Sequence, residues 1–337
     1  MYSNRLIFKT SNDDEIFYLK DTILINFTVN RNGISTSQLN PGTNELYKSV
    51  FNHHLSQEKI DYLENHDVYE YLTNECDLLG IDSKYSTGLI TLAEMKNVSI
   101  INKRFKNIEV TAIVTAGVRT NASRAGDPAS YWEHNGEFQF GTVNIILLTN
   151  VKLEKSALTE AFMTVTEAKT VALNNLKIPS QYSNGYATGT GTDGVAIFSN
   201  AESDNILTNA GKHSKLGELI GKSVIEAVTE AIGKQVWLTS KSQSNVLIRL
   251  NRYKLDINTF YDTLDCNKQE FIRQLQNDSK KQDNVAIATS VLNLFDEVEN
   301  NLIQKQVAYD LAMELKEKCN SYPIKKLLGY WINYFIR

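Results

Sequence analysis

Apolar residues follow two patterns along the chain: short continuous runs in the first two thirds, and helical spacing in the last third. Short runs rich in β-branched residues predict strands that are buried on both faces of a sheet. Such runs occupy residues 23–29, 98–101, 108–115, 141–150 and 195–198. The sequence therefore predicts a central β-sheet with 108–115 as an inner strand. The dipeptide Asn32-Gly33 predicts a hairpin after the first strand.

Helical spacing of apolar residues predicts helices between these strands. The predicted helices cover residues 45–79, with a break near His66, and then residues 156–176 and 214–232. The first of them would place His53 and His54 on a surface helix. Ser156 and Ser214 are suited to cap the other two, because a serine hydroxyl accepts hydrogen bonds from the unpaired amides of a first turn.

After residue 238 the predicted structure is almost entirely helical. Helices are expected near 256–277, 283–319 and 323–336, with one strand or edge at 246–250. A chain of 337 residues has room for two domains, since single cores rarely grow beyond about 250–300 residues. We therefore expect a mixed α/β (α+β) fold. Residues 1–238 would form a central sheet flanked by helices, and residues 239–337 a helical extension that acts as a dimerisation arm, a lid or a docking domain.

The most unusual segment is Thr-Gly-Thr-Gly-Thr-Asp-Gly at residues 188–194, which precedes a predicted strand. Three glycines permit backbone angles that other residues avoid, and the hydroxyls and the carboxylate favour contact with a ligand. The glycine spacing matches the dinucleotide-binding fingerprint, but that motif opens a helix, and no lysine follows as in a phosphate-binding loop. A tight turn between two core elements is the other interpretation.

A second polar stretch follows the predicted strand 108–115 and contains Asn121, Arg124 and Asp127. Together these side chains offer the donors and acceptors needed to hold amide or carboxyl groups. An ion pair between Arg124 and Asp127 that fixes the loop explains them equally well.

Isolated polar residues mark three further positions. Asn144 interrupts an apolar run, where an unsatisfied amide would cost about 1–3 kcal/mol, so it contacts either backbone or a ligand. Glu167 with Lys169 is typical of a solvated helix face, although both could line a pocket floor. His213 precedes a predicted helix, whose dipole favours a neutral imidazole that can act as a base. A histidine in that position is more often structural.

The composition narrows the class of protein. Hydrophobic residues make up 42% and charged residues 22%, as in ordinary soluble proteins, and a net charge of −4 without a basic cluster argues against nucleic-acid binding. No signal peptide or membrane span is evident, so a cytoplasmic location is expected. Three separate cysteines predict free thiols. His213 is the one histidine in these polar segments, and His134 lies in a predicted surface excursion at 130–140, so no three-ligand metal site is indicated.

Taken in order, the polar segments resemble the adenosylcobinamide amidohydrolase family, which acts in corrinoid salvage. Five blocks carry the resemblance: Thr-Ala-Gly-Val-x-x-Asn-Ala-x-x-Ala-Gly-Asp at 115–127, Gly-Thr-Val-Asn-Ile-Ile-Leu-Leu-Thr at 141–149, Leu-Thr-Glu-Ala and Thr-Glu-Ala-Lys-Thr within 158–170, Ala-Thr-Gly-Thr-Gly-Thr-Asp-Gly at 187–194, and His-x-Lys-Leu-Gly-Glu-Leu-Ile-Gly at 213–221. The match covers roughly residues 15–235. It implies hydrolysis of the amide between the corrinoid propionyl side chain and aminopropanol in adenosylcobinamide. The product would be adenosylcobyric acid, the corrinoid would be substrate and not cofactor, and metal dependence stays open.

For this reaction we hypothesise that Asp193 and His213 supply acid and base functions to a water molecule or to a threonine hydroxyl, with Thr192 the preferred threonine. Backbone amides of residues 189–194 would stabilise the oxyanion. The expected substrate-binding residues are Asn121, Arg124, Asp127, Asn144, Glu167, Thr188, Gly189, Thr190 and Gly191. Two other functions fit the same residues: a non-catalytic corrinoid-binding or delivery module, and a glycine-loop transferase that uses nucleotide. Assembly into a homo-oligomer is compatible with each.

Overall fold

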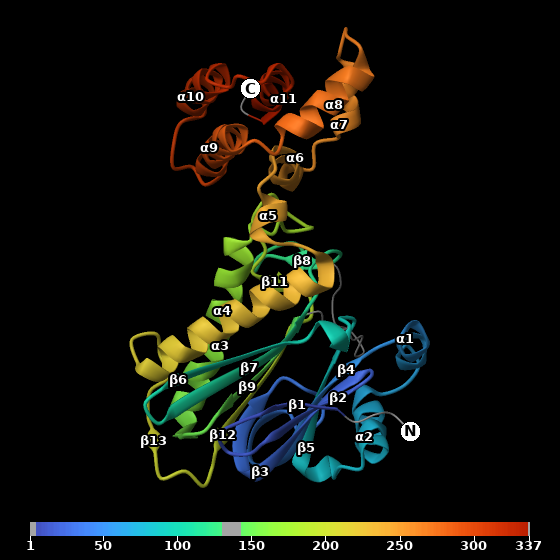
Figure 1. Ribbon diagram of the computed structural model, residues 1–337, viewed down its shortest axis with the longest axis vertical. Helices are drawn as coiled ribbons and strands as arrows, with labels where there is room; N and C mark the ends of the chain where they lie inside the picture. The colour runs from blue at the N-terminus through green and yellow to red at the C-terminus, as the bar shows by residue number, and fades with distance from the viewer. Residues whose placement is uncertain (1–4, 130–142, 336–337) are drawn as a thin grey trace. The chain divides into compact units, whose positions relative to one another are not determined.

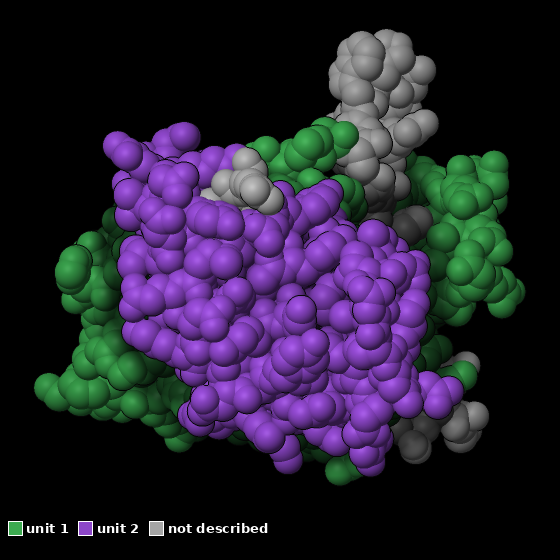
Figure 2. Space-filling model, turned by 90° about the horizontal axis from the view of Figure 1, so that it is seen from above, with its two compact units in different colours: residues 1–238 green, residues 239–337 purple. Residues whose placement is uncertain are grey.

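The computed structural model describes residues 5–129 and 143–335, and it separates into two compact units, Met1–Leu238 and Thr239–Arg337 (Figure 2). The first unit contains the sheet and its helices, and the second is helical (Figure 1). The predicted mixed fold with a helical C-terminal part is thereby confirmed. The predicted excursion at 130–140, His134 included, and the first two residues of the predicted strand 141–150 lie outside the described residues.

Within the described residues, one nine-stranded mixed sheet organises the first unit (Figure 1). Its main path runs β1 (Arg5–Lys9), β2 (Glu15–Leu19), β3 (Thr22–Ser35), β12 (Gly194–Asn200), β9 (Val143–Thr149), β7 (Ile108–Ala116) and β6 (Ser99–Phe105), while β4 (Gly42–His54) pairs with β3 and β5 (Ser86–Thr91). The pairs β12–β9 and β4–β5 are parallel, and the other pairs in this sheet are antiparallel. Because β12 is parallel to β9 and antiparallel to β3, both β12 and β9 begin where β3 ends.

Two long helices cover part of this sheet. α3 (Lys155–Asn175) and α4 (Lys215–Val236) pack against each other, and α4 crosses β6 and β7 (Figure 1). Ser214 caps α4 by accepting a hydrogen bond from the amide of Gly217, as predicted, whereas Glu154 and not Ser156 holds the capping position of α3. Two shorter helices, α1 (Gln57–Leu63) and α2 (Val68–Leu79), share a separate apolar cluster with β3, β4 and β5.

Short elements complete the first unit. β8 (Ala122–Ser123) pairs with β11 (Gly189–Thr190), and β10 (Lys152–Leu153) pairs with β13 (Ile206–Leu207). Two short 3₁₀ turns, η1 (Ser83–Tyr85) and η2 (Met95–Asn97), flank β5.

The second unit packs seven helices and one 3₁₀ turn around its own apolar core in the part of the chain that the structure describes. They are α5 (Ser240–Gln243), α6 (Val246–Leu250), η3 (Asn251–Tyr253), α7 (Ile257–Asp262), α8 (Lys268–Asp278), α9 (Gln282–Glu299), α10 (Lys305–Glu317) and α11 (Tyr322–Phe335). The strand predicted at 246–250 is therefore wrong. Its apolar residues Val246 and Leu250 are four positions apart, so one helical face buries both. No described helix has both the length and the apolar character to cross a bilayer.

Two predictions for the N-terminal part are wrong for a common reason, which is pairing with neighbouring strands of the sheet. Residues 42–54 form β4 and not a helix, because β3 and β5 pair with it on both sides and bury Val50 and Phe51. Asn32 and Gly33 lie inside β3 instead of forming a hairpin turn. A side chain at Gly33 would place its Cβ 2.5 Å from the carbonyl oxygen of Ile197, so this glycine admits the neighbouring strand β12.

The change from helix to strand also buries a histidine that the sequence placed on the surface. His53 on β4 is 2% exposed, and its Nε2 lies 2.6 Å from the ammonium nitrogen of Lys59. Since the ammonium only donates, Nε2 accepts, and Nδ1 donates to the hydroxyl of Thr22 at 2.7 Å. Glu75 from α2 lies 3.6 Å from Nδ1. Burial lowers the pKa of His53 to about 3, and the charges of Lys59 and His54 act in the same direction.

Because of His53, we expect the folded protein to lose stability in mild acid. Below its ordinary pKa of about 6.5 the unfolded chain takes up a proton that the folded protein refuses until about pH 3, so stability falls as the pH drops through this window. Between pH 7.5 and pH 5, His53 should cost about 2 kcal/mol of unfolding free energy. Urea unfolding of the wild type and of His53→Gln at both pH values measures it. The exposed His66 gives the control, since His66→Gln should keep the wild-type slope.

Candidate functional site

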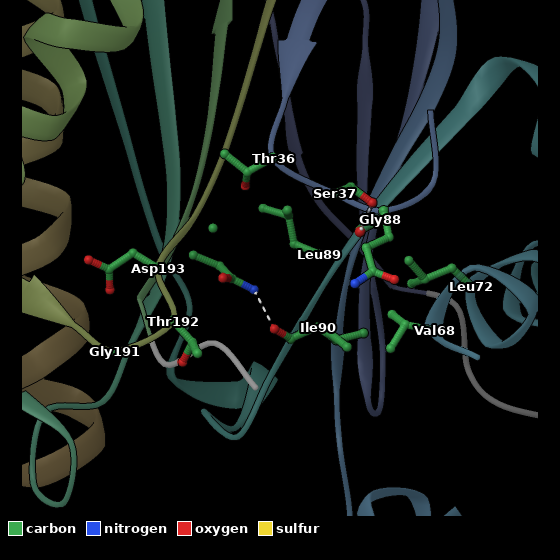
Figure 3. Close-up of a pocket in the computed structure, with 13 residues that line it drawn as sticks. Thr36, Ser37, Val68, Leu72, Gly88, Leu89, Ile90, Gly191, Thr192 and Asp193 are labelled. Carbon is green, nitrogen blue, oxygen red and sulfur yellow. Dashed lines mark hydrogen bonds between the residues drawn. The ribbon is translucent and has the colours of Figure 1, made fainter. Parts of the chain in front are cut away.

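A pocket of about 240 Å³ lies where β9 and β12 begin and β3 ends (Figure 3). Polar walls come from residues 36–38 after β3, from Asn144 on β9 and from residues 191–194. Apolar walls come from residues 88–90 of β5 and from Val68 and Leu72 of α2. A cavity with polar groups on one side and apolar groups on the other suits a polar function carried on a short apolar arm.

The glycine–threonine segment 188–194 forms part of this pocket and leads into β12, so the prediction that it feeds a strand is confirmed. Its glycines serve a different purpose from the one predicted, since Gly189, Gly191 and Gly194 do not adopt positive φ angles. They leave room for neighbouring side chains. A Cβ at Gly189 would overlap Oδ2 of Asp193, and one at Gly194 would lie 2.5 Å from Oδ1 of Asn144.

An ion pair between Asp193 and Lys169 anchors the glycine–threonine segment to α3. The side chains are 13% and 10% exposed, so the pair is nearly buried. Oδ1 of Asp193 also accepts from the amide of Thr190 at 3.0 Å and from its hydroxyl at 2.6 Å. The carboxylate therefore points away from the cavity, toward Lys169, while the backbone at Asp193 lines the pocket (Figure 3).

Asn144 forms the floor between the two polar walls and is 1% exposed. Its Nδ2 donates to Oδ1 of Asn52 at 2.8 Å and to the carbonyl oxygen of Ile90 at 3.0 Å. Asn52 in turn donates to the hydroxyl of Thr115 at 2.8 Å. This series of hydrogen bonds across β4, β7 and β9 satisfies the buried amides, and it leaves the oxygen of Asn144 beside Gly194 at the pocket.

The polar stretch after β7 pairs directly with the glycine–threonine segment. The carbonyl of Asn121 accepts from the amide of Gly191 at 3.3 Å, and the hydroxyl of Thr188 accepts from the amide of Ala125 at 2.9 Å. Asp127 accepts from the backbone amide of Arg124 at 2.7 Å and from the hydroxyl of Ser180. These bonds and the neighbouring Ser183 lower the pKa of the Asp127 carboxyl against the opposing effect of burial. The loop is thus fixed through the backbone of Arg124.

The expected site residues fall into four groups. Gly191, Thr192, Asp193 and Asn144 line the pocket, and Thr188, Gly189, Thr190 and Asn121 support its wall from β11 and the loop beside it. Arg124 and Asp127 lie on the loop that pairs with that wall. Glu167 forms an exposed ion pair with Lys212, and His213 is exposed in the turn before α4. The described lining of the pocket contains neither Glu167 nor His213.

Sequence reasoning missed several residues at the pocket. Lys169 was assigned to a solvated face or to a pocket floor, and it was not connected with Asp193. Asn52 was assigned to a helix and was not connected with Asn144. Thr36 was not among the expected site residues. Its hydroxyl accepts from the amide of Val195 at 3.0 Å, which fixes it at the pocket wall.

Within the residues that the structure describes, no group of three or more His, Cys, Asp or Glu side chains is arranged to hold a metal ion.

Two of the comparisons with known proteins name the same family. A family model described as adenosylcobinamide amidohydrolase matches residues 7–240. An uncharacterised protein of Methanocaldococcus jannaschii is 36% identical over 228 residues, covering 64% of this chain and 86% of that protein. A protein of Methanosarcina mazei named adenosylcobinamide amidohydrolase is 32% identical over 173 residues, covering 48% of this chain and 72% of that protein. A crystal structure of a Pyrococcus horikoshii protein aligns with a TM-score of 0.31 and 12% identity, over 71% of this chain and 84% of that one.

Proposed function

Since the chain belongs to the adenosylcobinamide amidohydrolase family, we propose that it hydrolyses the amide between the corrinoid propionyl side chain and aminopropanol in adenosylcobinamide. The products would be adenosylcobyric acid and free aminopropanol. The observation that carries the proposal is the pocket of about 240 Å³ that the glycine–threonine segment shares with Asn144 and residues 36–38. Pockets that enclose a drug-sized ligand measure about 300–1,000 Å³, so this one would take an amide arm and leave the larger macrocycle at its mouth.

Amide hydrolysis needs a nucleophile, donors for the developing oxyanion and a proton for the departing amine. In our proposal a water molecule or the hydroxyl of Thr192 attacks the carbonyl carbon. Backbone amides of residues 192–194, which line the same cavity, would receive the charge on the carbonyl oxygen. The C–N bond then breaks, and aminopropanol leaves with the proton that the attacking water or hydroxyl gives up. Where Thr192 attacks, a water molecule then hydrolyses the resulting ester, which yields adenosylcobyric acid and restores the hydroxyl.

The other two residues that were expected to be catalytic, Asp193 and His213, have different roles in this proposal. Asp193 is engaged by Thr190 and Lys169, which suits a carboxylate that holds the segment in place. We give no step to His213, because it is exposed in the turn before α4. The turnover rate of His213→Ala tests the hypothesis that His213 acts as an acid or base. A decrease of several orders of magnitude would show that the imidazole takes part in the reaction.

The decisive measurement is chromatographic detection of aminopropanol after incubation of the protein with adenosylcobinamide, with and without a nucleoside triphosphate. Release without nucleotide supports the proposal. Corrinoid binding without release would indicate a binding or delivery module, and a product that forms only with nucleotide would indicate a transferase. Thr192→Val should lower turnover by about 100-fold or more if its hydroxyl takes part. Thr229→Val is the matched control, because that hydroxyl bonds to the carbonyl of Ile225 within α4.

A further inference from the structure

Asn144 offers the pocket a hydrogen-bond acceptor whose direction is fixed by the protein. Both hydrogens of its amide are used, one by Asn52 and one by the carbonyl of Ile90. Figure 3 marks the second bond as the dashed line that ends at Ile90. Its oxygen receives no hydrogen bond from any residue that the structure describes. An amide oxygen without a donor is unfavourable in a protein interior, and this one borders a cavity that a ligand can enter.

The orientation of this amide follows from the chemistry of its neighbours. A backbone carbonyl only accepts hydrogen bonds, so the group that faces Ile90 must be the NH₂ of Asn144. Asn52 donates its own NH₂ to Thr115 and therefore presents its oxygen to Asn144. A flipped Asn144 would set its oxygen against two acceptors. The arrangement leaves Oδ1 as the only polar atom of Asn144 that is available to a ligand.

The neighbouring glycine leaves this oxygen accessible. A Cβ at Gly194 would lie 2.5 Å from Oδ1 of Asn144 and 3.2 Å from Cδ2 of Leu89, so any side chain there would cover the acceptor. Gly194 and Asn144 are paired in the parallel register of β12 and β9, and both line the pocket. The position of Oδ1, the hydrogen bonds that orient Asn144 and the space left by Gly194 are therefore all fixed by the strands of the sheet.

We propose that Oδ1 of Asn144 accepts a hydrogen bond from the N–H of the scissile amide and so makes the site selective for an amide over an ester. The inference rests on the proposed function. An ester of the same shape carries an oxygen where the amide carries N–H, so it would bring an acceptor against an acceptor. A site built to bind an N–H discriminates strongly against an analogue that lacks it, because its buried polar group is then left unpaired.

The test compares adenosylcobinamide with an analogue in which propanediol is joined through an ester in place of the amide. The measured quantity is the ratio of kcat/KM for amide to ester, in the wild type and in Asn144→Leu. The amide and the ester differ in intrinsic reactivity, and the two proteins can differ in the fraction of active molecules. Both differences cancel when the amide-to-ester ratio of the variant is divided by that of the wild type. The amide-to-ester ratio should fall about 10- to 100-fold in the variant, as expected for the loss of one buried hydrogen bond.

Asn102→Leu is the control, because Asn102 on β6 is likewise a strand asparagine whose amide donates to a neighbouring strand, to the hydroxyl of Thr111 at 2.8 Å, yet lies outside the pocket lining. Its ratio should equal that of the wild type. Asn144→Val replaces Asn144→Leu if circular dichroism shows the latter to be unfolded. A folded Asn144 variant with an unchanged ratio would overturn the inference.

Affinities for the two compounds, from corrinoid absorbance titrations, give the corresponding ratio without turnover. A wild type that binds adenosylcobinamide but releases no aminopropanol refutes the proposed function. Its ratio of affinities for the two compounds still shows whether Asn144 accepts a hydrogen bond from the amide N–H.

Discussion

Replacing Lys169 with methionine should lower the free energy of unfolding by about 3–5 kcal/mol and abolish aminopropanol release. The substitution keeps most of the side-chain volume but removes the cation that faces Asp193, whose carboxylate is only 13% exposed. A nearly buried charge without its partner is strongly destabilising, far more than the net value of the pair. The carboxylate also organises Thr190 on the pocket wall, so its displacement should disturb residues 191–194. Urea unfolding and the release assay measure the two effects.

A double-mutant cycle distinguishes the loss of this ion pair from a general destabilisation of α3. Lys169→Met combined with Asp193→Asn removes both charges, so it should recover part of the stability lost in Lys169→Met alone. Activity should not return, because the segment has lost its anchor. Lys222→Met is the control on α4, since its ion pair with Glu218 is exposed and its loss should change the free energy of unfolding little. A loss below 1 kcal/mol in Lys169→Met would show that the pair does not hold the segment.

The sequence predicted those parts of the fold whose signals are local. Continuous apolar runs located β7, β9 and β12, because strands buried on both faces carry few polar residues. A serine before an apolar helix located the start of α4. The prediction failed for β4, whose pairing with β3 and β5 overrides the helical spacing of its residues. His53 and Asn52 were misplaced with it.

The candidate site shows the same division between local and long-range information. The glycine–threonine segment and Asn144 stood out because polar residues beside apolar strands are unusual, and both line the pocket. Lys169 pairs with a residue 24 positions away, and Asn52 with one 92 positions away, so their partners depend on how the sheet assembles. The cap at Ser214 was predicted correctly, yet it fixes only the start of α4 and not the distance of His213 from the pocket.

Substitution of Gly194 by alanine should reduce kcat/KM by about 100-fold or more, while the protein stays folded. The added methyl group would lie 2.5 Å from Oδ1 of Asn144 and 3.2 Å from Leu89, so the amide must shift and the pocket loses space. Overpacking of this kind typically costs about 1–3 kcal/mol of stability, but the acceptor is displaced in every folded molecule.

Gly221 on α4 allows the same chemical change where it meets no neighbour, since a Cβ there finds nothing within 4 Å. Gly221→Ala should therefore raise the unfolding free energy by about 1 kcal/mol, through helix propensity alone, and leave turnover unchanged. Steady-state release of aminopropanol and urea unfolding of both variants make the comparison. Wild-type kinetics in Gly194→Ala would mean that substrate does not enter between the glycine–threonine segment and Asn144, and the reaction would have to be sought elsewhere on the first unit.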